Sequence, residues 1–361
     1  MQFDSRSFHN RHEALTEMLY DTPGMLPARY VFVLTTRCNL RCPFCFQAKK
    51  DGAGQAMTGD DWLALAAQLP EYARVTFTGG EPLIFPDFKR VFDFVASRHD
   101  CNLITNGLLL TEELVDFLLS FQRFRVLSVS VDSVGNTLRG VSPGKWAHAE
   151  RMMRYFVERR RKVHPQCLLD VKTTVVDDNS TDLLAIHRYC VETLGCDHHG
   201  FQFLKGSPLQ HADEACGFEE IDIPREAPRY VNFAAIKEQL AAVQRYNLEK
   251  GGKTFLHPKA ASLNDDGPLY IDWLNESLHR RQCFAPCKYP WASVHVNADG
   301  HLFPCLAVSM GNVRRQPLAE IVAGERFRRF RELIRARGTV AACNRCGWLT
   351  RRRETAGEGE G

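Results

Sequence analysis

Segments typical of β-strands alternate with segments typical of amphipathic helices from residue 30 to residue 204. The strand-like runs are short and β-branched, and helix-like stretches such as 145–159 and 182–194 separate them. Strands that alternate with helices form parallel βαβ units. Six units in about 175 residues are typical of an incomplete (β/α)6 barrel rather than a complete eightfold one. The expected strands are 30–36, 74–78, 102–105, 126–131, 168–175 and 201–204.

The alternation of side chains within these strands predicts a polar lumen. Apolar residues form one face of 168–175, while Asp170, Lys172 and Thr174 form the other. Helices cover the outside of such a barrel, so the polar set should point inward, as in a binding cavity; solvated strand ends on an open sheet are the alternative. Lys172 is the candidate catalytic residue, as a base, as a carboxylate anchor, or as the partner of Asp170. Candidate substrate contacts are Gln47, Gln202 and Lys205.

The chain of 361 residues contains 13 cysteines, and its N-terminus shows no secretory signal. A cytosolic protein does not keep disulfides, so the cysteines need another explanation. Three of them follow the first expected strand, at the strand end where barrels carry active sites. Three thiolates can hold three irons of a cubane cluster and leave the fourth iron open. The eight grouped cysteines are Cys38, Cys42 and Cys45, then Cys283, Cys287 and Cys305, then Cys343 and Cys346.

The first group, Cys-x3-Cys-x2-Cys with Phe44 before the last cysteine, resembles the signature of radical S-adenosylmethionine (SAM) enzymes. Residues 79–82, Gly-Gly-Glu-Pro, resemble the motif of that family that lies against SAM. Residues 105–107 and 128–140 are similar to its third and fourth strand ends, and the resemblance covers roughly residues 28–205. It implies SAM contacts at Phe44, Gly79, Gly80, Glu81, Pro82, Asn106, Ser130, Asp132 and Arg139.

The resemblance also implies a reaction. A 4Fe–4S cluster on Cys38, Cys42 and Cys45 would be reduced by a flavodoxin or ferredoxin type of donor and would cleave SAM. The resulting 5′-deoxyadenosyl radical would remove a hydrogen atom from a substrate, and the protein would position that substrate and exclude water.

A second module is expected from residue 283 to residue 347. Cys287 is followed by twelve residues, Gly300, four residues and Cys305, with a hairpin expected at 294–305 and a helix at 325–337. The pattern resembles the twitch domain, a shortened SPASM domain, which implies one auxiliary 4Fe–4S cluster. A zinc ion on the same four thiols is the alternative, and Cys283 has no assigned role. The implied ligands are Cys287, Cys305, Cys343 and Cys346.

Composition and charge narrow the remaining functions. A formal net charge of +3 gives no reason to expect bulk nucleic-acid binding, and no apolar run is long enough to span a membrane. Exposed iron–sulfur clusters predict an oxygen-sensitive cytoplasmic enzyme. The expected divisions are an N-terminal extension (1–29), the barrel (30–205), a connecting region (206–282), the auxiliary module (283–347) and a disordered tail (348–361).

The expected substrate is a small polar metabolite of the amino sugar or nucleoside type, which the enzyme would oxidise, rearrange or split. The auxiliary cluster would accept an electron or orient the substrate. The alternative within the family is modification of a ribosomally made peptide. An argument against this alternative is that the segment before the first strand is short and leaves little room for a leader-binding domain. A binding module with zinc or iron–sulfur and no catalysis is a third reading.

Overall fold

The computed structural model describes residues 5–45, 56–210, 215–252 and 254–352. In this part of the chain the strands form one ten-stranded sheet in the order β10-β9-β8-β1-β2-β3-β4-β5-β6-β7. Every pairing from β8 through β1 to β7 is parallel, and only β9 and β10 run antiparallel to their neighbours. The strands are β1 (Arg29–Val33), β2 (Arg74–Thr78), β3 (Asp100–Thr105), β4 (Phe124–Ser130), β5 (Leu168–Val175), β6 (His198–Phe203), β7 (Thr254–His257), β8 (Ser293–Val296), β9 (His301–Phe303) and β10 (Gly311–Asn312).

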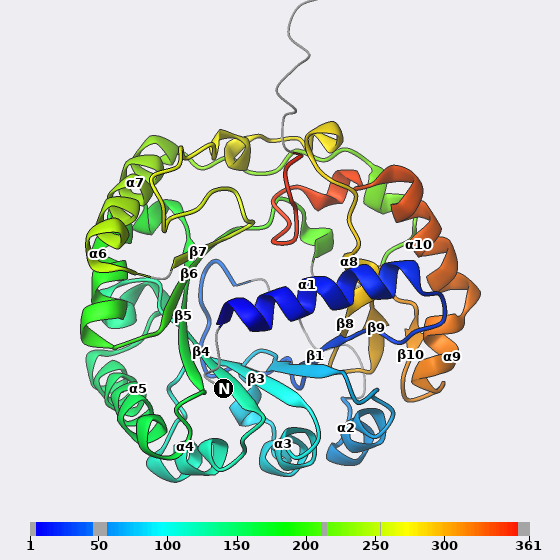
Figure 1. Cartoon of the computed structure of the whole chain (residues 1–361), viewed down its shortest axis with the longest axis horizontal. Helices are drawn as coiled ribbons and strands as arrows, with labels where there is room; N and C mark the ends of the chain where they lie inside the picture. The colour runs from blue at the N-terminus through cyan, green and yellow to red at the C-terminus, as the bar shows by residue number, and fades with distance from the viewer. Residues whose placement is uncertain (1–4, 46–55, 211–214, 253, 353–361) are drawn as a thin grey trace, which may run out of the picture.

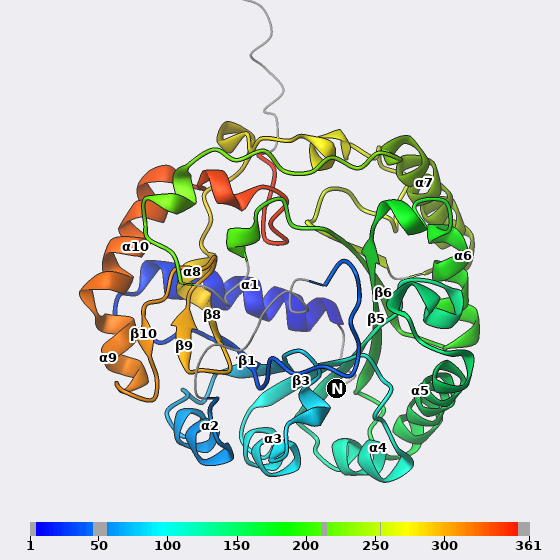
Figure 2. The same cartoon turned by 180° about the vertical axis from the view of Figure 1, so that it is seen from behind.

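The sheet curves into an incomplete barrel, and helices α2 to α7 lie along its outer face (Figure 1). Helix α1 crosses the barrel on one side, whereas the segment that follows β1 lies on the other side (Figure 2). The helices are α1 (Ser5–Asp21), α2 (Gly59–Ala66), α3 (Phe88–Ala96), α4 (Glu112–Leu119), α5 (Pro143–Val163), α6 (Leu183–Arg188), α7 (Phe233–Lys250), α8 (Tyr289–Ala292), α9 (Leu318–Ala323) and α10 (Glu325–Arg337).

Local sequence explains where two of these helices begin. At the start of α2, the Thr58 side chain accepts a hydrogen bond from Asp61 N, and Thr58 N donates to the Asp61 carboxylate at 2.8 Å. This reciprocal pair satisfies backbone donors that the first turn leaves unpaired. Thr111 caps α4 in a similar way, since its hydroxyl accepts from Leu114 N at 3.1 Å. The sequence Thr58-Gly59-Asp60-Asp61 predicts a helix start with Thr58 as its cap, and the structure confirms it.

Burial along β5 confirms the two faces predicted for that strand. Leu169, Val171, Thr173 and Val175 are fully buried against the helices, while the side chains between them are partly exposed. A barrel filled by its own core would bury both faces, so the partial exposure shows that the polar face of β5 is not packed as a core.

The helix-facing side of the sheet carries the core. Phe92 of α3 lies at its centre, with its ring 5.4 Å from Phe77 of β2 and 5.4 Å from Phe124 of β4. Rings of Phe88, Phe117 and Phe121 complete the contacts of Phe92. These contacts join two barrel strands to helices α3 and α4.

The six predicted barrel strands are confirmed to within three residues at each end, but the sheet is larger than predicted. The Gly-, Pro- and Asn-rich sequence of residues 251–278 predicts a mixture of loop and short helix, yet Thr254–His257 form β7 and extend the parallel sheet beside β6. Four residues are too few for side-chain alternation to identify a strand. The predicted hairpin is also confirmed, and its strand β8 pairs in parallel with β1, so the auxiliary module continues the barrel sheet.

Three other expectations change in detail. The helix expected at 182–194 is α6 followed by a π-helical turn, Tyr189–Thr193. The sequence predicts a helix at 227–250 in the connecting region, whereas α7 begins at Phe233, beyond Pro228. In the tail expected at 348–361, residues 348–352 lie packed, because Arg352 N donates to Cys283 O and the Trp348 ring stacks on Tyr289. Residues 353–361 lie outside the described chain.

None of the helices in the described ranges is both long enough and apolar enough to cross a membrane.

The ring cluster around Phe92 generates a stability prediction. Phe92→Ala should lower the free energy of unfolding by about 3–5 kcal/mol, because it leaves a cavity where rings from five neighbours meet. Phe94→Ala, which removes a partly exposed ring on the same helix, should cost much less. Urea unfolding followed by circular dichroism measures both; equal losses would contradict the placement of Phe92 at the centre of the core.

Candidate active site

The first cysteine group lies in the loop after β1, at the carboxyl end of the barrel strands. Cys38 is exposed, Cys42 is buried and Cys45 is half-buried. Cys45 N donates to Cys42 O at 3.1 Å, which forms a turn between these two residues. The three thiols lie within electrostatic reach of one another, since Cys38 and Cys45 both raise the pKa of Cys42. The loop therefore gathers the three sulfurs that the sequence analysis groups together.

Two glycines after β2 hold this loop in place. Gly80 N donates to Thr35 O at 2.7 Å, and Glu81 N donates to Arg37 O at 2.9 Å. A Cβ on Gly79 would lie 2.6 Å from Thr35 O, and a Cβ on Gly80 would lie 2.3 Å from Arg37 O. No larger residue fits at this distance without moving the segment that leads into Cys38. The glycines are thus needed for the backbone of the cysteine loop.

Glu81 connects the loop after β2 to the turn after β3. Its fully buried carboxylate accepts hydrogen bonds from Thr105 Oγ1 at 2.7 Å, from Asn106 N at 2.8 Å and from Leu83 N at 3.2 Å. Burial raises the pKa of Glu81, and these three donors oppose that rise. Pro82 begins the short helical turn that follows.

Asn106 extends this connection back to the cysteine loop. Its amide Nδ2 donates to Asn39 Oδ1 at 2.7 Å and lies 3.9 Å from Cys38 Sγ. Segments after β1, β2 and β3 therefore form one hydrogen-bonded unit around the first thiol.

A buried ion pair lies on the other side of the thiols. Arg139 Nε donates to Asp132 Oδ2, and the Asp132 carboxylate is fully buried. Arg139 NH1 also lies 3.7 Å from Cys42 Sγ, and its guanidinium lies 5.5 Å from the Phe44 ring. Burial lowers the pKa of Arg139, but Asp132 and Cys42 outweigh it and the net shift is upward. Arg139 therefore places a positive charge beside the sulfurs.

Two asparagines hold Asp132 in position. Asp132 N donates to Asn136 Oδ1 at 3.0 Å, and Asn179 Nδ2 donates to Asp132 O at the same distance. Thr174 N donates to the Asp132 carboxylate at 2.5 Å. Since the loops after β4 and β5 meet here, Asp132 has a positioning role that its place in the sequence pattern alone does not indicate.

The predicted lumen residues occupy neighbouring positions on β4, β5 and β6. Lys172 Nζ lies 2.9 Å from the Asp170 carboxylate, which also accepts from Ser128 Oγ at 2.8 Å. Of the three roles left open for Lys172, the structure shows the ion pair with Asp170. Ser130 pairs in register with Lys172, and Gln202 pairs with Thr174 on the next strand. Gln47 lies outside the described residues.

The second cysteine group comes together from three distant segments. Cys287, Cys305 and Cys346 are half-buried, and Cys343 is buried. Burial is the largest cause that raises the pKa of Cys287, to about 12, and Cys346 contributes to the same shift. Cys305 interacts electrostatically with the other three thiols, so all four face a common region. Cys283 donates its backbone N–H to Arg280 O at 3.0 Å.

Lys205 lies between the barrel and the second group. Its ammonium donates to Gln210 O at 3.0 Å and lowers the pKa of Cys305 and Cys346 against the larger effect of burial. Gly206 N donates to Asn344 O at 3.0 Å, so the chain after β6 packs directly on the auxiliary loop. Lys205, predicted as a substrate contact, therefore adjoins the auxiliary thiols.

The donor sets fit iron–sulfur clusters. Three thiols in one loop match a cubane with an open iron, and four converging thiols match a closed one. In the described residues, no three His, Cys, Asp or Glu side chains are close enough to share one metal ion. A cubane takes each thiolate on a different iron, whereas a zinc ion takes all of its thiolates itself. The raised pKa values mean that the thiols must lose protons when metal binds.

Some positioning residues carry no sequence signal of their own. Asn39 accepts a hydrogen bond from Asn106 Nδ2 within the site, yet it is an ordinary polar residue in the chain. The backbone of Thr35 and Arg37 could not be identified from residue type, because only carbonyl oxygens take part.

Comparison with protein-family models identifies two regions. The model of the Radical SAM superfamily matches residues 32–172, and the model described as an iron–sulfur cluster-binding domain (SPASM) matches residues 287–347. The first region contains the three-cysteine loop, and the second contains the four converging cysteines.

Two curated relatives match most of the chain. The sporulation killing factor maturation protein SkfB of Bacillus subtilis is 23% identical over 87% of this chain and 71% of its own length. A PqqA peptide cyclase of Granulibacter bethesdensis is 22% identical over 81% of this chain and 72% of its own length.

Among solved structures, Streptococcus suis SuiB bound to S-adenosylmethionine superposes with a TM-score of 0.61 at 15% identity. The match covers 89% of this chain and 71% of that one. SuiB bound to its precursor peptide SuiA gives a TM-score of 0.60. At this identity the likeness establishes the fold, an incomplete α/β barrel.

The glycine contact after β2 generates a prediction. Gly80→Ala should destabilise the protein by about 1–3 kcal/mol and reduce the iron bound at the first site, because its methyl group displaces the backbone before Cys38. Gly144→Ala is the matched control, since nothing lies within 4 Å of the added Cβ. Both variants also carry Cys343→Ala, which removes the auxiliary site. The bound iron is measured after anaerobic reconstitution, and equal iron in the two variants would refute the prediction.

Proposed function

Because the chain belongs to the radical SAM superfamily and carries a C-terminal SPASM-type iron–sulfur domain, we propose that it modifies a ribosomally made peptide by radical chemistry. The cofactors of such an enzyme are SAM and 4Fe–4S clusters. The proposed peptide substrate replaces the small polar metabolite that the sequence alone favours.

One observation carries the peptide proposal. Two relatives align with most of this chain, over the barrel and the auxiliary module together. One of them is named a maturation protein and the other a peptide cyclase. The similar fold of SuiB is recorded with a precursor peptide bound. Agreement over both modules bears on the substrate, because the substrate would lie between them.

The chain's own residues have defined tasks in this proposal. When bound, the SAM cluster supplies the electron that splits SAM into methionine and a 5′-deoxyadenosyl radical, which removes a hydrogen atom from the substrate. Cys38, Cys42 and Cys45 would hold three of its irons. The glycine backbone at 79–80 and the Asn106 turn would line the SAM pocket, and Arg139 would balance negative charge beside the sulfurs.

Three predicted SAM contacts are given more specific tasks. Phe44 lies under the Arg139 guanidinium and would cover one side of the site. Asp132 would orient Arg139 rather than bind SAM itself, because its carboxylate is fully buried and already accepts from Arg139 and Thr174. Ser130, the last residue of β4, would contact the ribose or carboxylate of SAM.

The lumen would hold the peptide segment that reacts. Lys172 and Asp170 form a pair that is only partly exposed, at 29% and 13% of their side-chain areas. An ion pair in such a place offers a donor and an acceptor to a peptide group without leaving an unpaired charge. Lys172 is thus proposed as a positioning residue, and Gln202 and Lys205 would extend this surface toward the auxiliary thiols.

The auxiliary cluster on Cys287, Cys305, Cys343 and Cys346 would accept an electron or orient the substrate. A flavodoxin or ferredoxin type of protein would reduce the SAM cluster. All thirteen cysteines are free thiols, so a reducing compartment such as the cytoplasm suits the enzyme.

A label-transfer experiment tests the peptide proposal. The anaerobically reconstituted chain is given SAM, dithionite and deuterated short peptides encoded beside its gene, and 5′-deoxyadenosine is analysed by mass spectrometry. Deuterium should enter 5′-deoxyadenosine from a peptide, in the native chain and in Cys101→Ala, which changes a buried cysteine outside both groups. Cys42→Ala should form none. Label arriving from amino sugars or nucleosides and from no peptide would contradict the proposal.

A second prediction concerns Lys172. Lys172→Met should preserve SAM cleavage but reduce modified peptide by about tenfold or more, since a mispositioned substrate loses the near-attack geometry. The ratio of modified peptide to 5′-deoxyadenosine measures this uncoupling. Lys89→Met, which removes an exposed ammonium on α3, should leave the ratio unchanged. A parallel loss of both products in Lys172→Met would assign the residue to SAM cleavage instead.

A further inference from the structure

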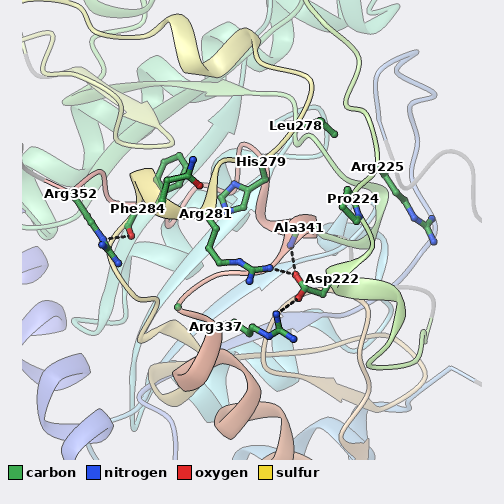
Figure 3. Close-up of a pocket in the computed structure, with 12 residues that line it drawn as sticks. Asp222, Pro224, Arg225, Leu278, His279, Arg281, Phe284, Arg337, Ala341 and Arg352 are labelled. Carbon is green, nitrogen blue, oxygen red and sulfur yellow. Dashed lines mark hydrogen bonds and ion pairs between the residues drawn. The ribbon is translucent and has the colours of Figure 1, made fainter. Parts of the chain in front are cut away.

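A cavity of about 550 Å³ lies outside the barrel lumen, beside the auxiliary module. Three segments far apart in the sequence form its walls: 222–225, 278–284 and 337–341, together with Arg352 (Figure 3). The cavity contains none of the predicted SAM or substrate residues. Its volume is in the range of ordinary ligand pockets.

The lining is strongly basic. Four arginines face one aspartate around the cavity, which leaves a surplus of three positive charges. His279 adds no charge at neutral pH, because burial and the nearby Arg281 lower its pKa to about 4. We call this site the arginine pocket, and its charged residues are Arg225, Arg281, Arg337, Arg352 and Asp222.

Asp222 holds two of the arginines in place. Arg281 NH2 lies 2.5 Å from Asp222 Oδ1, and Arg337 NH1 lies 3.6 Å from Asp222 Oδ2. The same carboxylate accepts from Ala341 N at 3.0 Å, which ties it to the auxiliary loop. Figure 3 shows Arg281 and Arg337 converging on Asp222, with Arg225 and Arg352 on opposite sides. One carboxylate thus preorganises two guanidinium groups without neutralising the pocket.

Hydrogen-bonding capacity remains in the pocket. The buried Nε of Arg281 has no hydrogen-bond partner, although a buried donor usually has one. Arg225 has only a distant ion pair, 3.9 Å from Glu220, and its side chain is 46% exposed. Of these two groups, the partly exposed guanidinium of Arg225 can donate to acceptors on an anionic ligand.

The apolar part of the wall distinguishes an organic anion from an inorganic one. Phe284 is buried and stacks on His279 at 5.0 Å, and Leu278 leaves 46% of its surface exposed. Pro224 completes this wall. A phosphate ion would use only the arginines, whereas an acidic polypeptide segment also brings methylene groups and apolar side chains to cover the wall.

We propose that the arginine pocket binds an acidic segment of the peptide substrate, at a site distinct from the residue that reacts. The polypeptide nature of the ligand rests on the proposed function; the anionic character rests on the pocket alone. Asp222 is within electrostatic reach of Cys343, so a segment bound here would lie alongside the auxiliary module. It would raise the local concentration of the reacting segment at the barrel.

Binding can be tested without catalysis. Fluorescein-labelled hexaglutamate and hexaglutamine are titrated with the reconstituted full chain, without SAM or reductant, and anisotropy is measured. Hexaglutamate should bind, more weakly as salt rises, and hexaglutamine should not. Equal binding of the two probes, or none of hexaglutamate, would overturn the proposal. Inorganic phosphate displacing hexaglutamate at equal concentration of binding groups would reassign the pocket to a small anion.

Variants of opposite effect locate the binding. Arg225→Gln and Arg337→Gln should each weaken hexaglutamate binding by about fivefold, since each removes one partly exposed charge. Asp222→Asn should strengthen it, because it releases two arginines while an amide oxygen can still accept from Ala341 N. Arg188→Gln, an exposed arginine of α6 paired with Glu192, is the control with no expected change. Native affinity in both arginine variants would overturn the assignment.

The two proposals fail separately. A chain that binds hexaglutamate through these arginines but transfers label from no peptide would contradict the proposed function and leave an anion-binding pocket. A chain that modifies a peptide equally well with Arg225→Gln and Arg337→Gln combined would retain the proposed function and remove the pocket's role in it.

Discussion

The close backbone contact between the ends of β1 and β2 is the constraint on which the site depends. Gly80 N and Glu81 N bond to the carbonyl oxygens of Thr35 and Arg37, and there is no room for a side chain at residue 79 or 80. The contact fixes the backbone immediately before Cys38. The Glu81 carboxylate then accepts a hydrogen bond from Asn106 N, and the Asn106 side chain donates to Asn39 in the cysteine loop. Three strand ends and the first thiol are therefore positioned together.

The second constraint is electrostatic. Burial disfavours thiolates, and it raises the pKa of Cys38 and Cys42 in the metal-free chain. Arg139 opposes that effect beside Cys42, and it is held there by a fully buried carboxylate. The auxiliary thiols have Lys205 in the corresponding place. Each thiol group thus has a neighbouring cation that another part of the fold anchors, which suits the binding of negatively charged clusters.

Much of this could be predicted from the sequence. Strand alternation predicted the six barrel strands and the inward face of Asp170 and Lys172, and cysteine spacing predicted two separate thiol groups. The pairing of strands distant in the sequence could not be predicted. Nothing in the residues of Thr254–His257 or of the hairpin near residue 300 indicates which strand edge they join. The same holds for backbone acceptors such as Thr35 O, and for the pocket walls, which three distant segments supply. These features depend on tertiary geometry, which local residue patterns do not contain.

Electron paramagnetic resonance gives the most direct test of the central claim, that the loop after β1 holds the cluster that binds SAM. In a reduced Cys343→Ala chain, with the auxiliary site disabled, the spectrum of the remaining cluster should change when SAM is added. The account predicts that change, and predicts that a Cys42→Ala chain with an intact auxiliary site gives a spectrum that SAM leaves unaltered. A SAM-induced change that survives Cys42→Ala and disappears in Cys343→Ala would contradict the account.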